Sequence, residues 1–435
     1  MPHVLLLGTL DTKLEEILYL RSRLLETSAR FSIPLEITLI DCGRQFTSCD
    51  VATVSHTDLV ARYSRDDPSD RLSWTRGQTI QFMAGCATRC VREIVTTSEI
   101  HGIIGAGGSG GTSLIAAVMR DAVPIGLPML IVSTVASGDT GPIVGETDIT
   151  LMYSVVDIAG TNGLLRNILG NAAGAMFGMA VTYEHDTTKP ANPINTRSKS
   201  GLKTRVGVTM FGVTTPCVDR IRHHLETKYS AEVFVFHATG HGGKAMERLV
   251  EDGQIDAVLD ITTTEICDLI AGGNMSAGPQ RLEAALKGGI PNIISLGATD
   301  MVNFGPMSTV PSQYRDRNLL VHNSSVTLMR TSLEECKRVG EFIVNKIKTY
   351  AQDPKLVEIW IPTGGVSSLG TPDGLFADTK ADMALADTIR LGLKGSGFRI
   401  IDDKRDINDV GFASDIAESL MALVNNRTSA KVHDP

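Results

Sequence analysis

The chain of 435 residues is long enough for two domains of about 200 residues each. Its composition, 42% hydrophobic and 21% charged with 42 glycines, is typical of a globular α/β protein. The net charge of −8 and the absence of an 18-residue apolar run argue against nucleic acid or a membrane as a partner.

The N-terminal segment "MPHVLLLGTLDTK" has no basic leader and no small-residue cleavage site, so it predicts a first β-strand and a cytoplasmic location. The seven cysteines are scattered and form no C-x-x-C pair. Reduced, mostly buried thiols are therefore expected in place of disulfides or a zinc site.

The first half alternates short apolar runs with helical stretches, the pattern of buried parallel strands joined by helices. Strands are predicted at 3–9, 35–41, 101–107 and 128–134 and in "ITLMYSV", with helices through "LEEILYLRSRLLET", near 78–97, from about 112, and through "LLRNILGNAAGAMFGMAVTYE".

The segment "HDTTKPANPINTRSKSG" at 185–201 has no periodicity and has the Pro, Thr, Ser and Asn content of a linker. Beyond it the rhythm restarts, with strands at 205–212, 232–240, 256–264 and 291–300 and in "LLVHNSS", "LVEIWIPTGG" and "FRIIDD". We expect an α/β fold of two Rossmann-like domains with open, mostly parallel sheets. The predicted boundaries are 1–190, a linker at 191–204, and 205–435.

In open α/β sheets, ligands bind beyond the carboxyl ends of the strands, and the first such loop is "GTLDTK". Asp11, Thr12 and Lys13 are expected to begin a helix, whose unpaired N–H groups suit an anion. Lys13 opposes the helix dipole unless it meets a phosphate. Asp11 could equally be a plain N-cap.

The second loop is "GAGGSGGTS", residues 105–113. Its glycines let backbone N–H groups wrap an anion, and the hydroxyls after them can cap a helix or bind phosphate, although a tight turn would use the same letters. The string matches neither a P-loop nor a dinucleotide fingerprint. The predicted phosphate-binding residues are Gly107, Gly108, Ser109, Gly110, Gly111 and Thr112.

The third loop, "STVASGDTGPIVGETD", follows the strand at 128–134. Thr134 is a small polar residue at the strand end, and Asp139 or Glu146 could hold the Mg²⁺ that accompanies phosphates. Ordinary surface-loop chemistry explains the same letters.

These loops, together with "SVVDIAGTN", "NAAGAMFGM", "HATGHGGKAMERL" and "LGATDMVNFGP", resemble the ATP-binding family typified by the tomato mosaic virus resistance protein. The resemblance runs through the whole chain. It implies two Rossmann-like domains, a homodimer, and an ATP site at Asp11, Thr12, Lys13 and the glycine loop 107–111. Plant relatives carry a further TIM-barrel-like domain, which we expect here on a separate partner protein.

The second half has an anion-binding candidate of its own in "HATGHGGKAMERL", where Gly242, Gly243 and Lys244 begin a helix. Further polar strand ends, including "DITTTE", "VHNSS" and "PTGGVSS", are expected at the same sheet edge. His237, His241 and His322 are the candidate acids or bases, although each is also explained as a structural histidine.

The sequence thus predicts a cytoplasmic protein that binds ATP, with Mg²⁺, at the first domain and an unidentified polar or phosphorylated metabolite at the second. Three functions fit: a nucleotide-dependent enzyme, a non-catalytic nucleotide-sensing or partner-binding protein, and a nucleotide-independent lyase or isomerase. No motif states whether ATP is hydrolysed.

Overall fold

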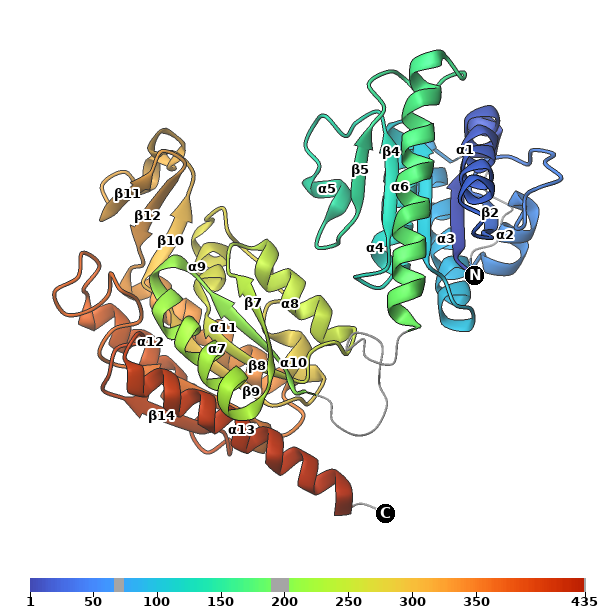
Figure 1. Cartoon of the computed structure of the whole chain (residues 1–435). Coiled ribbons are helices and arrows are strands. Elements are labelled where there is room, and N and C mark those ends of the chain that lie inside the picture. Colours follow the sequence, from blue (N-terminus) through green and yellow to red (C-terminus); the bar gives the residue numbers. More distant parts are fainter. Residues whose placement is uncertain (66–73, 189–202, 434–435) are drawn as a thin grey trace. The chain divides into compact units, whose positions relative to one another are not determined.

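The computed structural model describes residues 1–65, 74–188 and 203–433, and it divides into two compact units, Met1–Lys199 and Ser200–Pro435 (Figure 1). The predicted linker, 191–204, lies outside the described residues except for Lys203 and Thr204.

The first unit is a wholly parallel five-stranded sheet in the order β2-β1-β3-β4-β5. Its strands are β1 (His3–Gly8), β2 (Glu36–Asp41), β3 (Gly102–Gly107), β4 (Met129–Ser133) and β5 (Thr150–Tyr153). Its helices are α1 (Leu10–Phe31), α2 (His56–Tyr63), α3 (Arg76–Thr97), α4 (Ser109–Ala122), α5 (Gly141–Val144) and α6 (Gly163–Thr187).

Helices cover both faces of this sheet because its central strands are apolar or small at every position except His3, the first residue of β1. Along β1, Val4 and Leu6 face the core shared with α1 and α6, whereas Leu5 and Leu7 face the core shared with α3 and α4. This alternation is the two-residue period of a strand, here apolar on both sides.

The second unit has a parallel six-stranded sheet in the order β14-β13-β9-β8-β6-β7. These strands are β6 (Arg205–Met210), β7 (Glu232–His237), β8 (Ala257–Thr262), β9 (Asn292–Gly297), β13 (Val357–Pro362) and β14 (Arg399–Asp403). The helices are α7 (Thr215–Tyr229), α8 (His241–Glu251), α9 (Thr264–Ala271), α10 (Glu283–Lys287), α11 (Leu333–Tyr350), α12 (Thr379–Gly392) and α13 (Val410–His433). Two Rossmann-like α/β units are thereby confirmed.

A small antiparallel sheet in the second unit was not expected from the sequence. It contains β10 (Met301–Phe304), β12 (Val326–Arg330) and β11 (Leu319–Asn323), in that order. The prediction that "LLVHNSS" forms a strand of the parallel sheet is therefore wrong. Only Ser324 and Ser325 separate β11 from β12, and a connection that short can join antiparallel strands only.

Two further features of the structure concern its helices and its cysteines. Among the described residues, no helix combines the length and the apolar character needed to cross a bilayer. None of the seven cysteines forms a disulfide, and six of them are buried.

Candidate functional site

The main cleft of the first unit lies where the strand order reverses, beyond the carboxyl ends of β1 and β3. Connections leave these two neighbouring strands in opposite directions, which opens a crevice between the loops. The cleft has a volume of about 460 Å³. Its lining residues are Thr9, Thr12, Lys13, Arg76, Gly108, Ser109, Gly110, Gly111, Thr134, Val155, Val156 and Asp157.

The glycine loop forms one wall of this cleft and begins α4. Gly107 allows the helix to start close to the strand end, since a Cβ there would lie 2.9 Å from the Gly111 backbone. The N–H groups of Ser109, Gly110 and Gly111 donate no hydrogen bond to any described residue. They are the donors that the first turn of a helix leaves without partners, and their three residues line the cleft.

Two cations line the same cleft. Lys13 lies in the first turn of α1, where the sequence predicted it, but its non-helical backbone angles (φ −135°, ψ 31°) kink the helix there. Arg76 is the first residue of α3, and its Nη2 lies 3.4 Å from the position that a Cβ on Gly110 would occupy. Sequence reasoning missed Arg76. It is a first-turn cation like Lys13, so the same dipole argument marks it as a candidate for anion binding but does not assign it to this cleft.

Asp11, predicted to bind the nucleotide, does not line the cleft. Its Oδ2 accepts a hydrogen bond from the Arg44 N–H at 3.1 Å and lies 3.6 Å from the Arg44 Nε. The start of α1 is held instead by Asp41, whose Oδ1 accepts from the Leu10 N–H. Burial raises the pKa of Asp41. Asp11 therefore anchors the loop after β2, and a contact between Asp11 and the nucleotide stays a prediction.

Gly107 and Thr112, like Asp11, were predicted to contact the ligand but do not line the cleft. The Thr112 hydroxyl lies 2.7 Å from the Ser133 hydroxyl and 3.1 Å from the Gly107 carbonyl, so it ties α4 to the ends of β3 and β4. Both residues shape the site through packing. The predicted contacts that do line the cleft are Thr12, Lys13, Gly108, Ser109, Gly110, Gly111 and Thr134.

The predicted metal residues lie outside the cleft lining. Asp139 accepts a hydrogen bond from the Gly141 N–H at 3.2 Å, as in a local turn. Within the described parts of the chain, no three His, Cys, Asp or Glu side chains gather into a metal-binding group. Asp157 is the carboxylate that does line the cleft.

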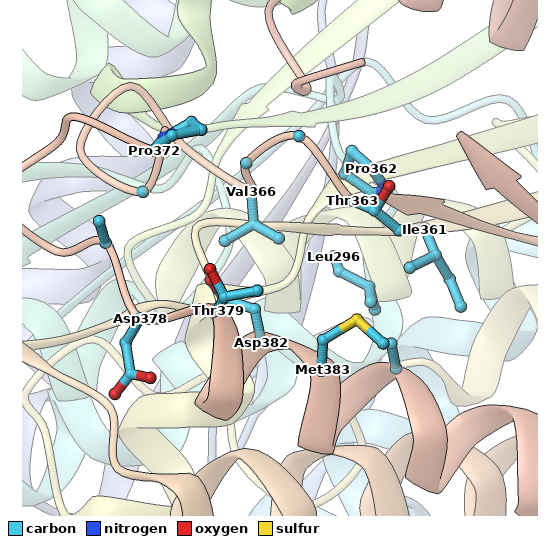
Figure 2. A pocket seen from close by; sticks show the side chains of 15 residues that line it. Leu296, Ile361, Pro362, Thr363, Val366, Pro372, Asp378, Thr379, Asp382 and Met383 are labelled. Carbon is cyan, nitrogen blue, oxygen red and sulfur yellow. The ribbon is translucent and has the colours of Figure 1, made fainter. Parts of the chain in front are cut away.

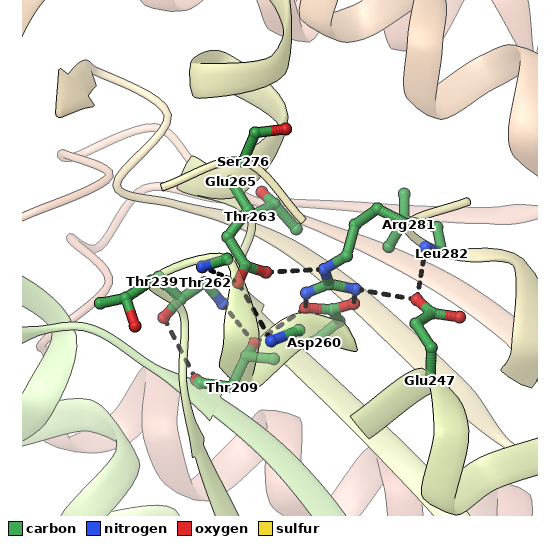
Figure 3. Close-up of polar contacts among 12 residues, drawn as sticks. Thr209, Thr239, Glu247, Asp260, Thr262, Thr263, Glu265, Ser276, Arg281 and Leu282 are labelled. Atoms are coloured by element: carbon green, nitrogen blue, oxygen red, sulfur yellow. Dashed lines mark hydrogen bonds and ion pairs between the residues drawn. The ribbon is translucent and has the colours of Figure 1, made fainter. Parts of the chain in front are cut away.

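In the second unit, the helix start predicted to hold an external anion holds one of the chain's own carboxylates (Figure 3). The N–H groups of Gly240 and Gly243 donate to Glu265 Oε1 at 2.7 and 3.0 Å. A Cβ on Gly243 would lie 2.1 Å from the same carboxylate. The prediction is corrected to this extent: a negative charge does sit at the start of α8, but Glu265 supplies it.

Glu265 belongs to a buried ionic cluster centred on Arg281, whose side chain is 1% exposed (Figure 3). The guanidinium donates to both oxygens of Asp260 at 2.5 and 2.6 Å, to Glu265 at 2.8 Å, and to Glu247 at 3.3 Å. Burial raises the pKa of Glu247, although Arg281 opposes that shift. Every carboxylate of the cluster accepts hydrogen bonds from groups of the protein itself, so the cluster is a structural element.

The three candidate histidines lie on three different elements, β7, α8 and β11. His237 is exposed at the end of β7 and packs edge-on to Phe211, with ring centroids 5.5 Å apart. His241 is exposed at the start of α8. His322 is exposed on β11 of the antiparallel sheet, so its predicted place at the edge of the parallel sheet is wrong.

A narrow cavity of about 50 Å³ lies at the carboxyl ends of β9 and β13, beside the start of α12 (Figure 2). Gly364 and Gly365 of "PTGGVSS" line it, whereas Ser367 is buried and donates to Asp300 Oδ2 at 2.6 Å. The wall includes the carboxylates Asp378 and Asp382 and contains no Lys or Arg. Its charge therefore does not suit a phosphorylated ligand.

Comparison with known proteins identifies both halves of the chain. The models for the N-terminal and C-terminal domains of an uncharacterised protein family, UPF0261, match residues 2–185 and 203–424. A UPF0261 protein of Clostridium tetani is 40% identical over 421 residues, covering 97% of this chain and 98% of its own. A protein of Rhizobium meliloti with the same family name is 39% identical, covering 98% of this chain and 100% of its own.

A longer relative comes from a plant. The ToMV susceptible protein tm-1(GCR26) of Solanum lycopersicum is 38% identical over 437 residues, and the match covers 97% of this chain and 56% of the tomato protein. A solved UDP-N-acetylglucosamine 2-epimerase matches with a TM-score of 0.19 and 11% identity, over 67% of this chain and 78% of the epimerase. The family models and the bacterial relatives together show that the chain belongs to the UPF0261 family.

Proposed function

We propose that the first unit binds ATP, with the phosphates held at the start of α4. The observation that carries this proposal is that one cleft is lined by Lys13, Arg76 and three residues, Ser109, Gly110 and Gly111, whose N–H groups have no acceptor among the described residues. Each feature attracts negative charge alone, and together they suit a polyanion such as a triphosphate. The family resemblance supplies the choice of ATP among such ligands.

The charges in the cleft also suit a magnesium complex. Two cations, Lys13 and Arg76, and one carboxylate, Asp157, line the cleft. Mg²⁺ in nucleotide sites is bound by one or two carboxylates together with phosphate oxygens and water, so Asp157 suffices as the protein ligand. Bound Mg²⁺ would neutralise phosphate charge, and Lys13 and Arg76 would orient the same group.

The test is a calorimetric titration of the full chain with ATP and with adenosine, each in the presence of Mg²⁺. We expect ATP to bind and adenosine to bind much more weakly, since the phosphates make the charged contacts. Equal affinities would contradict phosphate binding at the cleft. Phosphate release measured on the same samples separates the two nucleotide-dependent functions, because an enzyme turns ATP over and a sensing protein does not.

We also propose a small-molecule site in the second unit. The cavity at β9 and β13 has two carboxylates on its wall, and Asp382 accepts a hydrogen bond from the buried Arg330. An uncharged or cationic small molecule fits this wall better than a phosphorylated one. Thermal-shift screening of small amines against phosphate esters tests that preference.

A further inference from the structure

The cleft of the first unit changes character along its length. At one side of the cleft, Lys13 follows β1, the glycine loop follows β3, and Arg76 begins α3. At the other side, the loop after β5 contributes the apolar residues Val155 and Val156. β5 is two strands away from β3, a displacement of about 10 Å across the sheet. The cleft is therefore cationic at the glycine loop, and on the β5 side it has the apolar Val155 and Val156 followed by the carboxylate of Asp157.

Val155 has an unusual backbone conformation at the apolar end. Its φ is +63°, and among the described non-glycine residues with positive φ (Ser32, Val155, Ser230, Leu282 and Ala298) it is the β-branched one. A β-branched residue in this region is a genuine outlier, because its Cβ crowds the backbone.

Hydrogen bonds on both sides hold Val155 in this conformation. The Val156 N–H donates to the Ser154 carbonyl at 2.6 Å, closing a γ-turn around Val155, and the Ser154 hydroxyl donates to the Val156 carbonyl at 2.6 Å. The Ser154 N–H donates to the Ser133 carbonyl at 3.1 Å, which fixes the turn to the end of β4. Such strain persists only where its surroundings impose it, and it gathers at ligand-binding sites.

The strained turn leaves the Val155 side chain 57% exposed on the cleft wall. A glycine would take the same backbone angles without strain, so the feature that valine adds here is its isopropyl group. An exposed apolar side chain facing a polar cleft gains by contact with an apolar ligand surface.

On the basis of the proposed phosphate site, we propose that Val155 is the contact for the base end of the ligand and determines its class. The flat, uncharged ring of a nucleotide packs on the isopropyl group while the phosphates reach the start of α4. This assignment predicts selection of nucleotides over inorganic polyphosphates, because a polyphosphate leaves Val155 without a contact.

The experiment compares ATP with inorganic tripolyphosphate by calorimetry, using the full-length wild type, Val155→Ala and Val155→Gly. We expect ATP affinity to fall roughly tenfold in Val155→Gly and less in Val155→Ala, with tripolyphosphate affinity unchanged in both. The glycine variant should also unfold at a higher temperature, because the strain is relieved. The control is Ser230→Gly, which relieves positive φ in the second unit and should raise the unfolding temperature without changing ATP affinity.

The outcomes separate this inference from the proposed function. Wild-type protein that binds neither ligand overturns both. Wild-type protein that binds both ligands, with Val155 variants that keep full ATP affinity, overturns the role of Val155 alone. Equal losses for ATP and tripolyphosphate would also overturn it, because Val155 would then act on the phosphate end through the loop.

Discussion

The Glu265 carboxylate accepts a hydrogen bond from the Gly243 N–H at 3.0 Å, so the start of α8 carries a negative charge built into the fold. Glu265→Ala should lower the free energy of unfolding by about 3–5 kcal/mol, because it leaves Arg281 with one partner fewer and the N–H groups of α8 exposed to a cavity. Urea unfolding measures the loss.

A small anion should restore part of that stability. Formate or acetate can occupy the space of the missing carboxylate and accept from the same N–H groups. The control is Glu251→Ala, which removes an exposed carboxylate from the last position of α8. Formate that stabilises both variants equally would contradict a specific site at the start of the helix.

Gly111 provides the cleanest test of the glycine loop. A Cβ at Gly111 meets nothing within 4 Å, whereas one at Gly110 would lie 3.1 Å from Ile80. Gly111→Val should therefore keep the fold and weaken ATP binding at least about tenfold, or 1.4 kcal/mol, because the side chain blocks approach to the N–H groups. Calorimetry gives the affinity, and circular dichroism verifies the fold.

Gly174→Val is the matched control, since Gly174 lies in α6, is exposed, and also has nothing within 4 Å of its Cβ position. It should bind ATP as the wild type does. Unchanged affinity in folded Gly111→Val would rule out phosphate contact with this loop.

Lys13 and Arg76 should contribute to phosphate affinity through charge. Lys13→Ala and Arg76→Ala are each expected to weaken ATP binding several-fold and to flatten its dependence on salt, with little effect on adenosine. Arg44→Ala serves as the control, because Arg44 pairs with Asp11 and does not line the cleft. Equal losses for ATP and adenosine would place both cations away from the phosphates.

The fold was readable from the sequence because its determinants are local. The apolar run of β1 is buried on both faces, and such continuous apolar runs are typical of a parallel sheet that is covered by helices on both sides. The expected strands correspond to β1–β4 and β6–β9. The antiparallel sheet was missed because the apolar run of β11 resembles a buried strand of a parallel sheet. The feature that decides how β11 pairs is its two-residue connection to β12, which only antiparallel strands allow.

The site was readable only in part. Five glycines at the end of a buried strand indicate that a ligand or another segment approaches the backbone closely, whatever the tertiary contacts of the chain are. The loop at 105–111 could therefore be identified from the sequence as a candidate binding loop. Arg76 reaches the cleft from a different helix, and Glu265 fills the α8 start from a different strand end. Such pairings depend on tertiary contacts between distant segments, and no local pattern encodes them.

Asp268 lies buried in α9. Its two oxygens accept from the Asn303 N–H at 2.6 Å and from the Asn303 amide at 2.7 Å. Burial, the dominant cause, raises the pKa of Asp268 from 3.8 to about 7, while these hydrogen bonds lower it and Glu265 raises it. Between the two pKa values the folded chain holds a proton that the unfolded chain releases. The stability contributed by this proton is therefore fully present below about pH 4 and is lost as the pH rises to about 7.

Asp268→Asn should remove this dependence. Between about pH 5 and 6, the decline in the free energy of unfolding should become less steep by up to about 1.4 kcal/mol per pH unit. Urea unfolding is followed through Trp360, which is buried in the second unit, in a Trp74→Phe background that silences the other tryptophan. Asp373→Asn, which removes an exposed carboxylate of the same unit, should leave the slope unchanged. An identical slope in Asp268→Asn and Asp373→Asn would show that Asp268 ionises in the folded chain as it does in the unfolded one.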